Sequence, residues 1–86
     1  MSADMPAISR FKRFDARPLL ARGEEPLSAI LQRVEGLERG EGLLLVAPFL
    51  PSPLLELLGS KGFASKVQRG EAGSWLVYFW RSSGRG

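Results

Sequence analysis

Three carboxylates are the residues whose types and spacing could perform acid–base chemistry in this chain. Asp15 follows a predicted strand, and Glu24 and Glu25 precede a predicted helix, so the fold could gather them at one corner. The sequence contains no histidine and no cysteine. Serine nucleophiles therefore lack an imidazole base, and zinc and most transition metals lack their usual ligands.

A simpler interpretation of the same carboxylates is structural. A loop aspartate can order a turn, and a glutamate at a helix N-terminus interacts favourably with the helix dipole. We favour this interpretation over an acid–base pair. An enzyme or cofactor carrier that uses the Asp15/Glu24/Glu25 corner stays an alternative, and we expect no catalytic residue, no cofactor and no metal.

The composition is that of one small folded domain. The chain has 86 residues, of which 44% are hydrophobic and 24% charged, which argues against disorder. We predict a domain over residues 10–81, a flexible arm over 1–9 and a flexible tail over 82–86. The absence of cysteine suits the cytoplasm. No apolar run could span a bilayer, and no signal peptide is predicted.

The first half of the domain reads as strand, helix and strand. Residues 10–16 form a plausible first strand, which Pro18 ends. Residues 26–37 predict a helix, because apolar residues recur there at helical spacing. They are Leu27, Ile30, Leu31, Val34 and Leu37. The apolar run 43–47 predicts a buried strand.

The second half reads as helix, strand and strand. Ser52 followed by Pro53 predicts the start of a short helix with Ser52 as its N-cap, and Gly59 or Gly62 would end it. Residues 63–69 and 74–81 predict two strands, joined by a hairpin connection over 70–73. The order strand–helix–strand–helix–strand–strand gives a two-layer α/β sandwich with both helices on one sheet face.

The other face of the sheet would then be bare. In the last strand Trp75, Val77 and Phe79 point one way, and the other way point Leu76, Tyr78 and Trp80. An exposed apolar patch on a small domain often marks a contact with a partner protein or a second copy. Two alternatives stay open: the N-terminal arm covers this face, or a one-residue slip in register exchanges the two faces.

A basic set near the N-terminus suggests a different partner. The chain carries a net charge of +3, and residues 10–17 hold Arg10, Lys12, Arg13 and Arg17, interleaved with phenylalanines. Such a set could follow the phosphate backbone of RNA or DNA. A solvated rim that is balanced by acidic residues is the simpler interpretation, so nucleic acid is the less favoured partner.

The chain resembles the TusA/SirA-like sulfur-carrier superfamily. The similarity rests on Phe-Asp-Ala-Arg-Pro-Leu at 14–19, Glu-Pro-Leu at 25–27 and Arg-Gly-Glu at 39–41. The aromatic ending at 75–81 is similar to a cysteine-free branch of small bacterial domains of unknown function. The resemblance implies a four-stranded mixed sheet in the order 1-2-4-3, with two helices on one side.

The resemblance also marks a chemical difference. In the carriers, a cysteine at the first helix's N-terminus takes up sulfur as a persulfide, and the helix dipole favours its thiolate. Here that position falls within Arg22, Gly23, Glu24 and Glu25, and a carboxylate cannot carry sulfane sulfur. We therefore predict a non-catalytic binding or adaptor module that acts by protein–protein contact. Its expected surfaces are the 22–25 loop and the bare sheet face.

Overall fold

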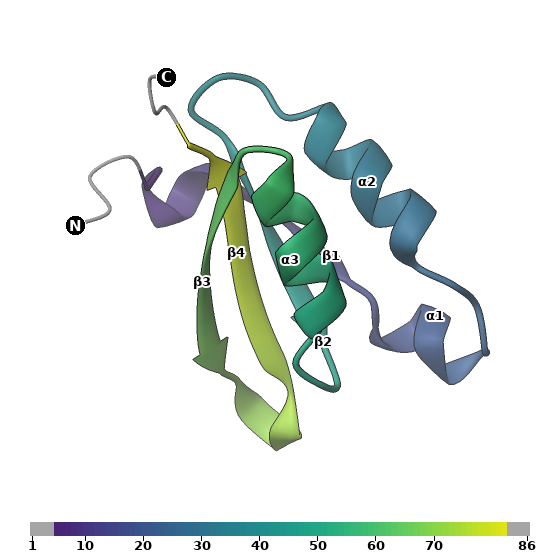
Figure 1. Ribbon diagram of the computed structural model, residues 1–86. Coiled ribbons are helices and arrows are strands. Elements are labelled where there is room, and N and C mark those ends of the chain that lie inside the picture. Colours follow the sequence, from purple (N-terminus) through teal and green to yellow (C-terminus); the bar gives the residue numbers. More distant parts are fainter. Residues whose placement is uncertain (1–4, 83–86) are drawn as a thin grey trace.

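The structure is a four-stranded sheet with its longer helices on one face (Figure 1). It is a computed structural model, and it describes residues 5–82. In chain order the elements are η1 (Ile8–Arg10), β1 (Phe11–Asp15), α1 (Arg17–Ala21), α2 (Leu27–Glu35), β2 (Gly42–Ala47), α3 (Ser52–Ser60), β3 (Phe63–Arg69), η2 (Glu71–Gly73) and β4 (Trp75–Arg81).

The sheet has the strand order β1-β2-β4-β3, which confirms the predicted mixed sheet. β1 and β2 are parallel neighbours, and β4 lies antiparallel to both β2 and β3. Because β1 and β2 run the same way, the chain leaves both strands at the same edge of the sheet. It enters α1 and then α2 after the first strand, and α3 after the second.

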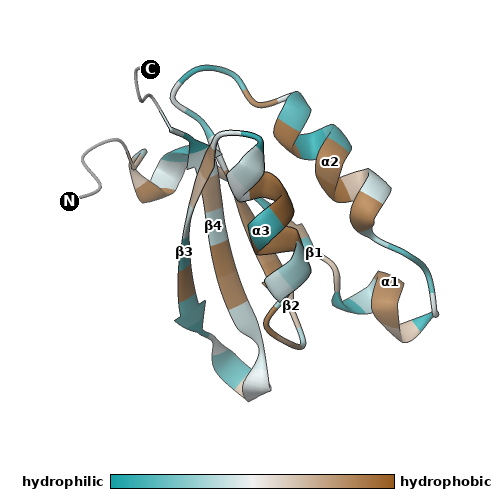
Figure 2. Cartoon of the chain, in the orientation of Figure 1, coloured by the Kyte–Doolittle hydropathy of each residue, from teal (hydrophilic) through white to brown (hydrophobic). Residues whose placement is uncertain are grey.

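The hydrophobic core lies between the sheet and the helices. Val77 and Phe79 of β4 are fully buried, together with Leu58 of α3. Burying a side chain of this kind stabilises the fold by roughly 1.5–3 kcal/mol before conformational entropy is subtracted. Figure 2 shows the apolar residues concentrated on β2 and β4 and along α2 and α3. The predicted orientation of Val77 and Phe79 toward the helices is confirmed.

Two local predictions differ from the structure. Pro18 does not simply end a strand but lies in the first turn of the short helix α1, where its missing N–H is harmless. Ser52 is the first residue of α3 rather than its N-cap, and Pro51 takes the capping position without a side-chain hydrogen bond. The helix runs past Gly59 and ends just before Gly62, whose φ is 92°.

The outer sheet face is not bare along its whole length. Tyr78 is 8% exposed and Trp80 is 3% exposed, so the expectation that they form an open surface is wrong. The Phe11 ring packs edge-on against both, with centroid distances of 5.1 Å to Tyr78 and 6.3 Å to Trp80. Gly42 lies between Phe11 and Trp80 in register, and its missing side chain leaves the space that the Phe11 ring occupies.

The two ends of the described chain meet on one side of the molecule. Pro6, Arg81 and Ser82 line the same cleft, and η1 and the end of β4 both lie at the upper left in Figure 1. The predicted arm and tail fall partly on residues 1–4 and 83–86, outside the described residues. Within residues 5–82, no helix is long and apolar enough to cross a membrane.

Candidate functional site

An apolar pocket of about 260 Å³ opens where β1 and β2 end and where α2 and α3 begin. Parallel strands bring their carboxyl ends, and the helices that follow them, to one edge of a sheet, which is where α/β folds usually bind ligands. The volume lies just below the usual range for small-molecule pockets, roughly 300–1,000 Å³. It suits an inserted side chain better than a large cofactor. The lining residues are Ala16, Leu20, Glu25, Pro26, Leu27, Ile30, Leu45, Ala47, Phe49, Pro51, Pro53, Leu54 and Leu57.

Large hydrophobic residues remain exposed around this pocket. Leu27 is 36% exposed and Phe49 is 53% exposed, and both line the pocket. Leu50, the neighbour of Phe49, is 40% exposed. Figure 2 shows the apolar colour continuing into the loop that connects β2 to α3. Among the described residues, the only other large hydrophobic side chain with this exposure is Ile8, in η1.

The sequence explains why these side chains stay outside the core. Pro48 and Pro51 bracket Phe49 and Leu50, and their fixed φ angles restrict how this loop can fold back. Leu27 is the first residue of α2, so it lies one turn before Ile30, which is buried. Helical spacing alone groups Leu27 with the apolar face that Ile30 and Val34 bury, but in the structure Leu27 is exposed.

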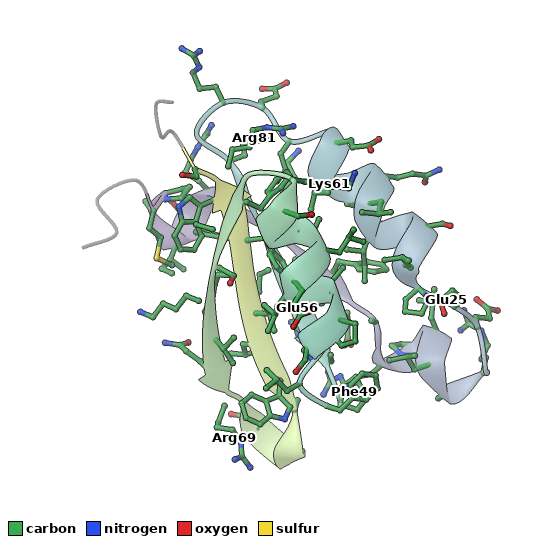
Figure 3. The ribbon with its side chains drawn as sticks, viewed as in Figure 1. Glu25, Phe49, Glu56, Lys61, Arg69 and Arg81 are labelled. Atoms are coloured by element: carbon green, nitrogen blue, oxygen red, sulfur yellow. The ribbon has the colours of Figure 1, made fainter. Side chains whose placement is uncertain are left out.

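One charged residue lies in the pocket wall. The Leu27 backbone N–H donates a hydrogen bond of 3.0 Å to Glu25 Oε2. This bond satisfies one of the free N–H groups at the start of α2, and it places negative charge at the positive end of the helix dipole. Figure 3 shows Glu25 and Phe49 at the same end of the molecule. The pocket therefore combines an apolar interior with one acidic position on its rim.

The loop before Glu25 forms its own ion pair on the surface. Arg22 donates from Nε to Glu24 Oε2 at 3.0 Å and from Nη2 to Oε1 at 3.2 Å. These hydrogen bonds lower the pKa of Glu24. Gly23 between them has a φ of 77°, a conformation that favours glycine. Both side chains are well exposed, so the pair adds little to stability.

The three carboxylates of the predicted acidic corner each have a separate partner. Arg17 donates to Asp15 Oδ1 from Nε at 2.9 Å and to Oδ2 from Nη2 at 2.7 Å. These bonds lower the pKa of Asp15 to about 2, so it holds no proton to donate at neutral pH. Glu24 is paired with Arg22 and Glu25 with the Leu27 amide. Among residues 5–82, no group of three or more possible metal ligands occurs.

The four basic residues of the predicted nucleic-acid surface do not form one patch. Lys12 and Arg13 are adjacent in β1 and therefore point to opposite faces of the sheet. Lys12 Nζ lies 3.7 Å from Glu41 Oε2. Arg10 Nε donates to the Gly40 carbonyl at 3.4 Å, and Arg17 is held by Asp15.

The predicted partner surface is likewise divided between the two faces of the sheet. Glu25 lies at the pocket on the helix side, while half-buried Leu76 lines a second cleft on the outer face. Phe49 and Leu27 were not predicted as site residues. The sequence did offer a signal for Phe49: Phe49 and Leu50 are two large apolar residues between Pro48 and Pro51, and these prolines restrict how the loop folds back.

One of the comparisons with known proteins identifies a relationship, and it is a match to a protein family. No curated protein and no solved structure shows a significant match to the chain. A family model does match over residues 13–81, which covers β1 from Arg13 onward, the whole of β2, β3 and β4, and all the residues that line the helix-side pocket. The chain therefore belongs to the family described as "uncharacterized conserved protein (DUF2249)".

Proposed function

We propose that this chain is a small, non-catalytic binding module that acts by protein–protein contact through the apolar pocket. One observation carries the proposal: two exposed hydrophobic side chains, Leu27 and Phe49, line a pocket that is itself apolar, and a third, Leu50, follows Phe49 in the chain. Exposed apolar clusters next to a concavity are typical of protein contact sites.

The partner that this geometry suits is a protein segment that inserts one large apolar side chain. A buried aromatic or aliphatic anchor carries most of the affinity in many protein interfaces. Leu27 and Phe49 would flank the inserted group, and their own exposed surface would be removed from water as well. Each square ångström of apolar surface so buried contributes roughly 25 cal/mol.

The resemblance to sulfur carriers supports the position of this site. In the carriers the reactive cysteine stands at the N-terminus of the first long helix. The resemblance puts that position within residues 22–26 of this chain, and two of these residues, Glu25 and Pro26, line the pocket. The strand order and the helix placement are those that the resemblance implies. We propose that the chain is a relative that keeps a docking site at this helix end and lacks the persulfide chemistry.

The two alternative functions gain less support from the geometry. Acid–base catalysis at the 15/24/25 corner would need a carboxylate that exchanges protons near neutral pH, and Asp15 has a pKa of about 2. Nucleic-acid binding by base stacking would need open aromatic rings beside the basic residues of β1. There Phe14 is buried, and Phe11 packs on Tyr78 and Trp80. Binding of RNA or DNA that weakens steeply with salt would revive the second alternative.

Affinity capture with matched variants tests the proposed contact. Wild type, Phe49→Ser and Ile8→Ser would be immobilised, and proteins retained from an extract of cells that express the chain would be quantified. Ile8 is the matched control, because it is 63% exposed and lies in η1, away from the pocket. We expect Phe49→Ser to lose partners that wild type and Ile8→Ser both retain.

A retained partner would then be purified and titrated against the same three proteins. We expect Phe49→Ser to weaken binding at least tenfold, in the range of an interface hot spot. Equal affinity of all three proteins for every retained partner would overturn the proposal.

A further inference from the structure

A second cleft, with a volume of about 690 Å³, lies on the outer face of the sheet. Its floor is apolar and comes from β2 and β4: Val46 is buried, and Leu44 and Leu76 are half-buried. Phe11 does not line it, since that ring lies over Gly42 at the other end of β2. The remaining lining residues are Arg13, Arg17, Arg69, Gly70, Glu71, Ala72 and Ser74.

One wall of this cleft is the turn between β3 and β4. The Ser74 hydroxyl donates to the Glu71 carbonyl at 2.7 Å, and the Gly70 N–H donates to the Ser74 carbonyl at 2.8 Å. A Cβ on Gly70 would lie 2.6 Å from Ser74 Oγ and 3.2 Å from the Leu76 side chain. The glycine therefore allows this hydrogen-bonded turn to close against Leu76, which fixes that end of the cleft.

The opposite wall is cationic. Arg13 is exposed, and among residues 5–82 no carboxylate lies within 4.0 Å of its guanidinium. Arg17 stands beside it and is paired with Asp15. The side-chain hydrogen bond from Arg17 is the main cause of the lowered pKa of Asp15, and the positive charge of Arg13 adds a smaller lowering. One negative charge therefore faces two positive charges along this wall.

The other charged groups of the cleft do not cancel this excess. Glu71 lies in the β3–β4 turn, and β2 and β4 separate it from β1 in the sheet. The Arg69 guanidinium stacks on Trp75, 4.7 Å from the ring centroid, on the helix side of the sheet. The cleft therefore has a cationic end at β1, an apolar middle and a polar turn at its far end.

We propose that this cleft binds a small amphipathic carboxylate, with its anionic head at Arg13 and its apolar body across Leu44, Val46 and Leu76. The volume lies within the roughly 300–1,000 Å³ of ordinary small-molecule sites. An exposed arginine presents fixed donors that match a carboxylate. This site is on the opposite sheet face from the helix-side pocket, so it is independent of the proposed protein contact.

A titration followed by NMR tests the proposal with octanoate as the probe. Backbone amide shifts of isotope-labelled protein would be recorded with octanoate, octylammonium and octanol. We expect saturable shifts at Leu44, Val46 and Leu76 with octanoate. Octanol and octylammonium should bind more weakly there, and salt should weaken the binding of octanoate.

Two variants and a control separate charge from packing. Arg13→Gln should weaken octanoate binding about two- to fivefold, the scale of an exposed ion pair. Leu76→Gln should weaken octanoate and octanol alike. Lys61→Gln is the control, because Lys61 is exposed at the end of α3 and does not line the cleft; it should leave the affinity unchanged.

Three results would overturn the inference: no saturable shift with octanoate, equal binding of octanol and octanoate, or shifts centred on Phe49. The first two results do not bear on capture of a partner at the helix-side pocket, and the third would show that octanoate prefers that pocket to the outer-face cleft. Conversely, loss of that protein contact in Phe49→Ser would leave the octanoate titration unchanged, so failure of one proposal is distinguishable from failure of the other.

Discussion

Two clusters of large apolar residues lie at opposite ends of β2, and they differ in how far they are exposed to solvent. At its first residue, Gly42, the rings of Phe11, Tyr78 and Trp80 pack together on the outer face. β2 ends at Ala47. In the loop that follows, Phe49 remains exposed at the helix-side pocket, and its neighbour Leu50 is exposed as well. The first cluster is closed by the protein's own side chains, and the second is left open.

The difference shows that exposure here is not a consequence of aromatic content. Trp80 is larger than Phe49, yet it is 3% exposed against 53%. The outer-face cluster is closed because Gly42 has no side chain, so the Phe11 ring can occupy the space above it. At the loop between Pro48 and Pro51, no side chain of the described residues covers Phe49 and Leu50 in this way. Apolar surface that the protein's own side chains leave uncovered is therefore a better indicator of a contact site than aromatic content.

The largest expected effect comes from truncating the closed cluster. Trp80→Ala should lower the free energy of unfolding by about 3–5 kcal/mol, because it removes a buried ring and leaves a cavity. Urea denaturation followed by circular dichroism measures this loss. A change below about 1 kcal/mol would mean that Trp80 is a surface residue, and the comparison would fail.

A second test adds a methyl group instead of removing a ring. Gly42→Ala should destabilise by about 1–3 kcal/mol, because the new Cβ would lie 2.4 Å from the Phe11 ring and 2.8 Å from the Phe79 carbonyl. The control is Gly59→Ala in α3, where nothing lies within 4 Å. Alanine there should be neutral or stabilising by up to about 1 kcal/mol. Combining Gly42→Ala with Phe11→Leu should recover part of the loss.

The turn between β1 and α1 gives a pH-dependent effect. Hydrogen bonds from Arg17 lower the pKa of Asp15 from 3.8 to about 2 in the folded state. A depressed folded-state pKa stabilises the protein above pH 4, and this contribution is lost as pH falls from about 4 to about 2. The Asp15 and Arg17 side chains are 31% and 41% exposed, so solvent screening reduces the contribution to about 1 kcal/mol.

Asp15→Asn checks this assignment. At pH 7 the variant should be less stable than wild type by about 1 kcal/mol. The difference should shrink as pH falls below about 4 and vanish only below about pH 2. Urea titrations at several pH values provide the measurement. A constant difference across that range would show that the loss comes from packing or capping rather than from the charge.

The smallest effect on stability is expected at the open cluster. Phe49→Ser should change the free energy of unfolding by no more than about 0.5 kcal/mol, as for ordinary surface substitutions. Thermal unfolding next to wild type measures it. A loss comparable to that of Trp80→Ala would show that Phe49 supports the fold, and its exposure could then not be assigned to a partner.

Local patterns in the sequence predicted most of the fold. The helical spacing from Leu27 to Leu37 and the alternation in the last strand both describe elements that the structure contains. The short helix α1 escaped prediction because a proline after a strand is equally compatible with a strand end and with a first helical turn. No periodicity exists in five residues to decide between them.

The candidate site was less predictable because it depends on contacts between distant residues. The alternation in β4 correctly placed Tyr78 and Trp80 on the outer face, yet it held no information on whether Phe11 would cover them. That contact requires β1 to lie beside β2 with Gly42 in register. The pocket likewise arises from the β2–α3 loop meeting the start of α2, and no local pattern in the sequence encodes that meeting.

The position of Pro6 and Ser82 at one cleft has a practical consequence for presentation of the molecule. Arg81, which lines the same cleft, lies at the end of the sheet away from Phe49 (Figure 3), so chain that continues before Pro6 or after Ser82 leaves the described domain at that end. Surface immobilisation would therefore hold the domain with its helix starts directed outward. In a fusion protein the helix-side pocket, with the exposed Phe49, would remain accessible to solution.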